Sequence, residues 1–170
     1  MMYCHMSETP TRMRPLESVA MISAPINVPQ MDPTPPTKLV PPGMTAAIAL
    51  QKAGVTLNDL SFVETHDCFT VAELIEYEAM GLTPKGQGFR AIKEGWTLKD
   101  GKLPVNPSGG LKAKGHPIGA TGVSMHVMTA MQLAGQAPEG MQLASPKLGG
   151  IFNMGGAAVA NYVSILEPAK

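Results

Sequence analysis

The stretch from Asn106 to Gly122, NPSGGLKAKGHPIGATG, constrains the fold most, because it places a histidine and a proline directly before an apolar helical pattern. Proline is favoured at the first helical position, so Pro117 predicts that His116 occupies the N-cap. The helix should bury one face and end at Gly135. Its apolar positions are Ala120, Val123, Val127, Ala130, Met131 and Ala134. The partial positive charge of a helix N-terminus would keep the His116 ring neutral and able to accept a proton.

A second group of reactive side chains, Thr-His-Asp-Cys-Phe-Thr, follows a strand predicted at residues 60–65 from alternating hydrophobicity and β-branched residues. Residues 71–80 predict a helix, with Thr70 and Glu73 as a capping box. Cys68 would then lie at a strand-to-helix turn, where a helix N-terminus lowers a thiol pKa and favours acid/base or nucleophilic chemistry. The alternative is plain packing, because cysteine is among the most buried residue types.

The remaining patterns complete an alternating order of strands and helices. Strands are predicted at residues 18–24 and in two runs within 147–167 that meet at Gly155-Gly156. A further helix is predicted at residues 43–53. Residues 25–42 hold seven prolines and predict an extended connector, whereas residues 1–17 predict a tail or a remnant. Helices between strands indicate an α/β domain at 18–170, with a mixed β-sheet and helices on both faces.

Three motif matches fail on their context. Residues 86–91 have the letters of a dinucleotide-binding fingerprint, but they follow a predicted helix and open none. Residues 110–115 have phosphate-loop spacing, yet His116-Pro117 stands where lysine and serine or threonine are required. The histidines and cysteines lack zinc-like spacing, and His126 suits packing or the surface. These patterns predict neither a nucleotide nor a metal cofactor.

Charge and composition exclude several classes of protein. Thirteen basic and thirteen acidic residues cancel and form no basic run, so nothing suggests nucleic acid or an anionic membrane as partner. No apolar run approaches the roughly 18 residues that span a bilayer, and the N-terminus lacks a signal-peptide core. Two distant cysteines, Cys4 and Cys68, argue against a disulfide-rich secreted domain. We therefore expect one soluble, cytoplasmic domain.

Three motifs in one order resemble the thiolase superfamily. GGLKAKGHPIGATG resembles its GHP histidine segment, HDCF resembles the motif of its sterol-carrier-protein-2-type branch, and NMGGAAVANYVSILE resembles its closing hairpin. Together they cover roughly residues 16 to 168 and resemble the C-terminal half of such a thiolase. The resemblance implies an acyltransferase that cleaves 3-oxoacyl-CoA thiolytically or forms it by Claisen condensation. Its substrates would be coenzyme A thioesters, with no bound cofactor.

The resemblance also implies roles for single residues. His116 would activate a nucleophilic cysteine and help to hold the thioester oxygen. His66 stands where other thiolases carry an asparagine that positions a water, and it could donate a hydrogen bond to an oxyanion. Cys68 would exchange the α-carbon proton of the acyl group, since Asn153 stands where more common thiolases carry that cysteine. The residues assigned to the oxyanion or substrate loop are Gly155, Asn153 and Gly115.

The acyl-accepting cysteine of thiolases and most of their coenzyme A contacts lie in an N-terminal half that these residues do not match, and Cys4 lies in no comparable motif. We therefore expect a missing half, from the same gene or a separate chain, and a homo-oligomer in the intact form. Exposed apolar faces would make the isolated chain poorly soluble. Two alternatives are a non-catalytic module for acyl-CoA, lipid or scaffolding, and a retro-aldolase of steroid side-chain degradation, which Cys68 disfavours.

Overall fold

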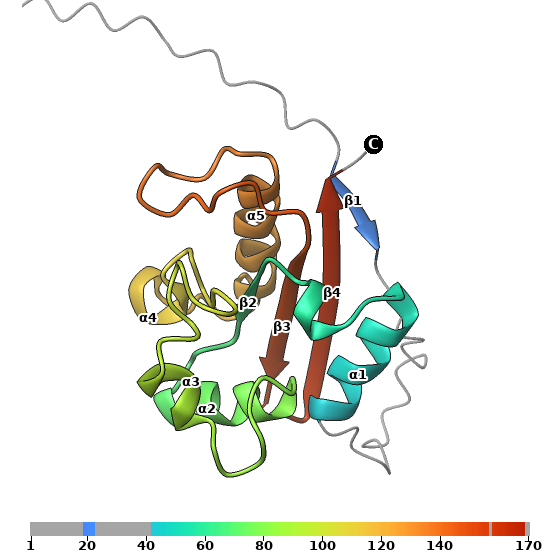
Figure 1. Ribbon diagram of the computed structural model, residues 1–170, viewed down its shortest axis with the longest axis vertical. Coiled ribbons are helices and arrows are strands. Elements are labelled where there is room, and N and C mark those ends of the chain that lie inside the picture. Colours follow the sequence, from blue (N-terminus) through green and yellow to red (C-terminus); the bar gives the residue numbers. More distant parts are fainter. Residues whose placement is uncertain (1–18, 23–41, 157, 169–170) are drawn as a thin grey trace, which may run out of the picture.

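The computed structural model describes residues 19–22, 42–156 and 158–168. Its strands form a mixed sheet in the order β1-β4-β3-β2, in which β2 and β3 are parallel and the other pairs antiparallel (Figure 1). The strands are β1 (Val19–Ile22), β2 (Phe62–Thr65), β3 (Gly149–Gly155) and β4 (Ala160–Pro168). The predicted α/β class with a mixed sheet is confirmed. The predicted tail and most of the proline-rich connector lie outside the described residues.

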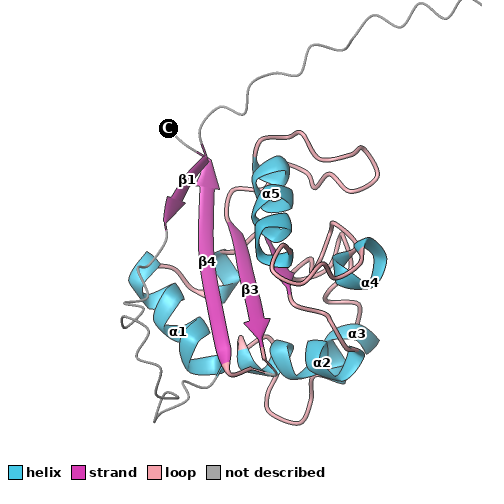
Figure 2. Ribbon diagram, turned by 180° about the vertical axis from the view of Figure 1, so that it is seen from behind, coloured by secondary structure: helices cyan, strands magenta, loops and turns pink. Residues whose placement is uncertain are grey.

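The helices between these strands lie on both faces of the sheet, as predicted (Figure 2). They are α1 (Pro42–Ala53), the 3-10 helix η1 (Leu57–Asp59), α2 (Thr70–Ala79), α3 (Phe89–Lys93), α4 (Gly110–Lys114) and α5 (Thr121–Leu133). Gly54 and Gly135 follow α1 and α5 with φ of +70° and +67°, so both predicted glycine stops are confirmed. No helix among the described residues is long and apolar enough for a membrane span.

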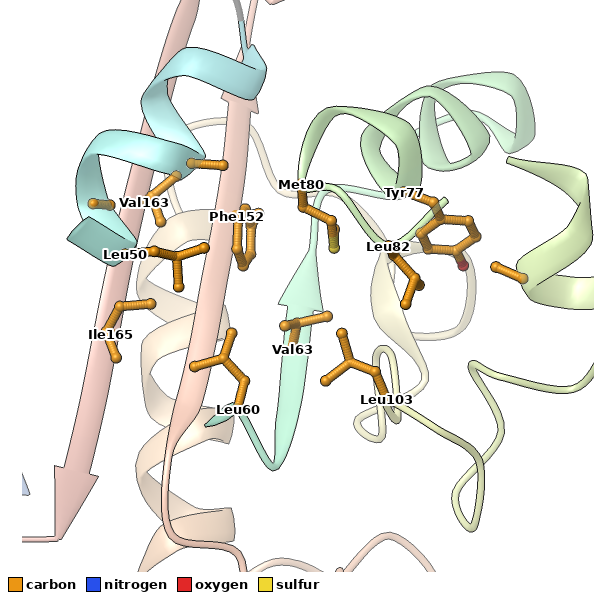
Figure 3. Packing of buried hydrophobic residues seen from close by; sticks show 13 residues of the cluster. Leu50, Leu60, Val63, Tyr77, Met80, Leu82, Leu103, Phe152, Val163 and Ile165 are labelled. Atoms are coloured by element: carbon orange, nitrogen blue, oxygen red, sulfur yellow. The ribbon is translucent and has the colours of Figure 1, made fainter. Parts of the chain in front are cut away.

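The main core lies between α1, α2 and one face of the sheet (Figure 3). Phe152 of β3 and Val163 of β4 are buried there with Leu50 of α1. Because successive side chains of a strand point to opposite faces, Ile151 faces the other way and packs in a smaller cluster with Met125 of α5. The sheet is thus apolar on both faces, and each face carries a helix.

The buried side of α5 is not the side that apolar spacing predicts. The buried residues of α5 are Thr121, Met125, Thr129, Gln132 and Leu133. Val123 is 66% exposed and Val127 is 49% exposed, so the prediction of a buried stripe is wrong. The reason is that Gln132 faces inward and uses its amide oxygen to accept a hydrogen bond from the backbone N–H of Leu143, while the apolar side points outward. We call the exposed residues Ile118, Val123 and Val127 the α5 stripe.

Two smaller predictions also fail. The side chains of β2 are buried along its whole length, not on one face alone, because Val63 packs in the main core and Phe62 packs in the smaller cluster on the opposite face. Residues 86–91 do open a helix, since Gly88 is the N-cap of α3. That helix has only five residues and follows α2, so the context of a dinucleotide fold is still missing.

Candidate active site

His66 lies at the point where β2 ends and is held against β3. Its backbone N–H donates to the carbonyl of Phe152 at 3.0 Å, which continues the strand pairing by one residue. Its Nδ1 lies 2.8 Å from Oδ1 of Asn153. Because an amide oxygen only accepts, Nδ1 carries the proton in this arrangement and Nε2 of the neutral ring carries a lone pair. Burial lowers the pKa of His66, so the neutral ring is favoured.

His116 is fixed in the same tautomer by a different partner. Its Nδ1 lies 2.7 Å from Oγ1 of Thr121, and that hydroxyl lies 3.2 Å from the carbonyl oxygen of Pro117. The hydroxyl has one proton, which it donates to the carbonyl, so it must accept the proton of Nδ1. Nε2 of His116 is therefore the free proton acceptor. The rings of His66 and His116 meet edge to face with centroids 4.8 Å apart.

His116 does not cap α5, contrary to prediction. The N-cap of α5 is Ala120, and residues 117–120 form a turn in which the Pro117 carbonyl accepts from the backbone N–H groups of Ala120 and Thr121. Gly119 has φ of +83°, a left-handed conformation that interrupts the helix between Pro117 and Thr121. His116 is exposed, and the Thr121 hydroxyl rather than the helix terminus orients its ring.

Cys68 lies in the turn between β2 and α2, as predicted, and is half-buried and free. The predicted lowering of its pKa is wrong. Burial raises the pKa of Cys68, and the negative charges of Glu76 and Asp67 raise it further. The predicted capping box is also absent, since Phe69 is the N-cap of α2 and no side chain caps it. At neutral pH Cys68 is therefore a thiol, which suits a proton donor.

An open cleft of about 670 Å³ runs beside α5 over β3 and β4. The predicted site residues that line it are His66, His116, Asn153 and Gly155, whereas Cys68 and Gly115 are not among its lining residues. Its walls include Ile118 and Val123 of the α5 stripe. The sequence patterns thus identify four residues that the fold brings to one cleft from three separate segments.

His126 and Ser164 also line the cleft, and sequence reasoning gave them no site role. Nδ1 of His126 lies 2.7 Å from the carbonyl oxygen of Gly122 and must donate to it. Nε2 therefore accepts from the Ser164 hydroxyl, 3.1 Å away. The predicted packing role of His126 fits, because this pair joins α5 to β4.

Two buried carboxylates join the segments that carry the two site histidines. Asp67 accepts from the backbone N–H of Leu111 at 2.7 Å, and Glu64 accepts from the Ser108 hydroxyl at 2.6 Å. A Cβ atom at Gly110 would come within 2.3 Å of Asp67, so this contact requires glycine. Sequence reasoning missed both carboxylates, although Asp67 lies within the HDCF motif and the glycine pair before Leu111 signals a close backbone approach.

No group of three histidine, cysteine or acidic residues in the described part of the chain is arranged to hold a metal ion. The polar side chains that line the cleft carry imidazole, amide and hydroxyl groups, and they lie beside apolar walls.

Comparison with known proteins agrees with the fold and the motifs. The family model described as "Thiolase C-terminal domain-like" matches residues 30–168, and the chain therefore belongs to this thiolase family. It is 44% identical over 119 residues to "Acetyl-CoA acetyltransferase" of Methanothermobacter thermautotrophicus, which covers 70% of this chain and 31% of that protein. It is 48% identical over 87 residues to "Sterol carrier protein 2" of Homo sapiens, which covers 51% of this chain and 16% of that protein.

The fold also resembles a solved structure. The chain described as "Ltp2-ChsH2(DUF35) aldolase" matches with a TM-score of 0.65 and 20% identity, over 75% of this chain and 31% of that one. At this identity the likeness supports the fold alone. The chain thus spans less than a third of the length of these relatives, and their remaining parts have no counterpart in the matched residues.

Proposed function

We propose that this chain provides the C-terminal part of a thiolase-type acyltransferase, which cleaves 3-oxoacyl-CoA with coenzyme A or condenses two acyl-CoA molecules. The observation that carries the proposal is the pair of histidines, fifty residues apart in sequence, whose rings meet beside an open cleft. Two imidazoles whose Nδ1 atoms are already engaged in hydrogen bonds leave their two Nε2 atoms for groups in the cleft.

His116 acts as the base in this proposal. Its free Nε2 takes the proton of a nucleophilic cysteine from outside the matched residues, and the resulting thiolate attacks the substrate carbonyl. During thiolysis the C–C bond breaks, the Cys68 thiol gives its proton to the α-carbon of the departing acetyl-CoA, and the acyl group stays on the nucleophilic cysteine. The Cys68 thiolate then takes the proton of coenzyme A, whose sulfur accepts the acyl group, and the released cysteine takes its proton back from His116. In condensation Cys68 takes the α-carbon proton back. The raised pKa of Cys68 fits a donor that stays protonated until the carbanion forms.

His66 stabilises the substrate oxyanion, but only in its other tautomer. In the observed arrangement Asn153 accepts the proton of Nδ1, so Nε2 has no hydrogen to donate. Rotating the Asn153 amide by half a turn presents its NH₂ group to Nδ1 and moves the ring proton to Nε2. His66 then donates to the oxyanion, assisted by the backbone at Gly155. Asn153 thus serves the oxyanion site indirectly, through the tautomer of His66.

The α5 stripe supplies the surface on which the rest of the site is completed. Ile118, Val123 and Val127 are all exposed, and the first two line the same cleft as His116. An apolar patch beside reactive groups is typical of an interface. The occupant in this proposal is the N-terminal thiolase half, which brings the nucleophile and coenzyme A contacts. The intact enzyme is a homo-oligomer.

A complementation assay tests the proposal. The 170-residue chain is mixed with the N-terminal half of a sterol-carrier-protein-2-type thiolase, and thiolysis of acetoacetyl-CoA is followed. We expect activity that His116→Ala and Cys68→Ser each lower by about 100-fold or more. Cys68→Ser should leave the affinity for acetyl-CoA, measured by calorimetry, unchanged.

Three results would contradict the acyltransferase. Full activity in Cys68→Ser would remove the acid/base role of that thiol. Binding of acetyl-CoA without any turnover would favour a non-catalytic module. Release of an aldehyde from a β-hydroxyacyl thioester, without free coenzyme A, would favour an aldolase.

A further inference from the structure

Glu76 is a buried carboxyl group that the proposed chemistry does not use. It lies on α2, is 7% exposed, and accepts a hydrogen bond from the Thr65 hydroxyl. Thr65 is the last residue of β2 and directly precedes His66. The Glu76 carboxyl group therefore holds the start of the turn that carries His66 and Cys68.

A small cavity connects Glu76 to the other side of the site. Glu76 and Asn153 both line it, and its volume is about 20 Å³. This is large enough for one water molecule. Asn153 in turn bonds Nδ1 of His66. Glu76 thus bonds the residue before His66 directly and lines the same cavity as Asn153, the side-chain partner of His66.

The charges that face Glu76 and Cys68 are negative. Asp67 in the turn and Glu73 on the same helix both oppose ionisation of Glu76. Burial raises the pKa of Glu76 to about 8, against the lowering effect of the Thr65 hydroxyl. The ion pairs of the α4 lysines are Lys112 with Asp67 and Glu73, and Lys114 with Glu64. Glu76 and Asp67 are also the charges that oppose ionisation of Cys68.

We propose that Glu76 is a positioning residue of this site, which fixes the turn between β2 and α2 and, when ionised, opposes the loss of the proton from Cys68. Cys68 becomes the thiolate more readily when Glu76 is neutral than when it is ionised, so the state of Glu76 changes how easily Cys68 gives up its proton. This inference rests on the proposed role of Cys68 for its functional meaning, but the coupling itself is measurable without catalysis.

The rate of Cys68 alkylation by iodoacetamide, measured against pH, tests the coupling. Cys4→Ser leaves Cys68 as the only thiol, and the thiolate is the reacting species. In this background Glu76→Gln, which keeps an acceptor for Thr65, should move the midpoint to lower pH by about half a unit to one unit. Glu78→Gln is the matched control on the same helix and should not move it. An unchanged midpoint in Glu76→Gln, or an equal shift in Glu78→Gln, overturns the proposal.

A second variant keeps the test decisive if Glu76→Gln does not fold. Thr65→Val removes the hydroxyl donor, so Glu76 stays neutral to higher pH and the alkylation midpoint should again move down, by less. No movement in this variant contradicts the proposal. The proposed function fails separately: a normal alkylation shift with full thiolysis in Cys68→Ser would leave the coupling intact and remove the acyltransferase role. If Glu76→Gln and Thr65→Val keep the wild-type alkylation midpoint while Cys68→Ser loses thiolysis, the coupling is refuted and the acyltransferase role stands.

Discussion

The two faces of the sheet differ in how completely this chain covers them. On the α1 face, Phe152 and Val163 are buried against Leu50 in the main core. On the α5 face, Ile151 is buried, but the helix turns its α5 stripe outward beside an open cleft. Both faces have apolar sequence patterns. Apolar spacing therefore identifies a surface that packs against something. It does not tell whether the packing partner lies in this chain or in another part of the protein.

The same comparison separates stability from chemistry. The residues buried on the α1 face are mostly hydrophobic. The cleft on the α5 face is lined by His66, His116 and Asn153. We expect substitutions on the α1 face to change the free energy of unfolding, and substitutions around the cleft to change activity in the completed enzyme.

The largest effect should come from the closed α1 face. Phe152→Ala removes a ring that is 7% exposed and leaves a cavity between α1 and the sheet. We expect a loss of about 3–5 kcal/mol in the free energy of unfolding, measured by urea denaturation. A loss below about 1 kcal/mol would mean that this face is not closed as described.

Asn153→Asp should affect activity strongly. An aspartate offers only acceptor oxygens to Nδ1 of His66, so above the pKa of His66 the ring cannot move its proton to Nε2. We expect about a 100-fold lower thiolysis rate in the complementation assay at pH 8. Asn153→Ala, which permits either tautomer, should lose less. Equal rates in both variants would contradict the tautomer argument.

Glu76, on the α1 face, should make the free energy of unfolding depend on pH. The pKa of Glu76 is raised from 4.5 to about 8, so between these values the native state binds more protons than the unfolded state and stability falls as pH rises. His66, whose pKa is lowered from 6.5, contributes in the opposite direction, because its stabilisation is lost as pH falls below that value. Relative to wild type, Glu76→Gln should therefore gain stability from pH 5 to 8, by more than about 1.4 kcal/mol. Parallel stability curves would contradict this.

Gly122→Ala, in α5, should disturb the site at His66 with little change in the free energy of unfolding. A Cβ atom at this position would lie 2.9 Å from Nδ2 of Asn153 and displace that flexible amide from His66. We expect the His66 ring resonances to shift while the unfolding free energy changes by less than about 1 kcal/mol, because the gain in helix propensity offsets the contact. Gly140→Ala, where a Cβ atom meets open space, is the control. Unshifted resonances would contradict the account.

The smallest effect on the isolated chain should come from the α5 stripe. Val127 is 49% exposed, so Val127→Asp should change the unfolding free energy by only about 0.5 kcal/mol. A loss comparable to that of Phe152→Ala would show that the stripe is part of the core of this chain.

The strands, the glycine stops and the two histidines could be predicted because each has a local signal. Gly135 and the alternation of β3 and β4 specify backbone conformation within a few residues. The pairing of His66 with Asn153 joins residues far apart in sequence, and no local pattern records it. The pKa of Cys68 was predicted with the wrong sign, because position beside a helix gives no measure of burial or of the charge on Glu76.

The predicted N-cap at His116 failed for a different reason, which is that proline alone does not specify where a helix begins. Pro117 correctly signals a turn that leads into α5, but Gly119 delays the helix by four residues, so His116 lies outside it. Proline restricts its own φ and removes one donor, and several turn geometries satisfy both conditions. The orienting bond from Thr121 becomes visible only when the turn is folded.

The most direct test of the central claim, that the open α5 face is where another part of a thiolase completes this site, is the thiolysis rate of equimolar mixtures with the N-terminal half. Wild-type chain and Val127→Asp are compared at concentrations where both are folded. We predict turnover with the wild-type chain and at least a tenfold lower rate with Val127→Asp, because an aspartate on the α5 stripe would be buried without a partner. Equal rates with both chains would contradict the claim.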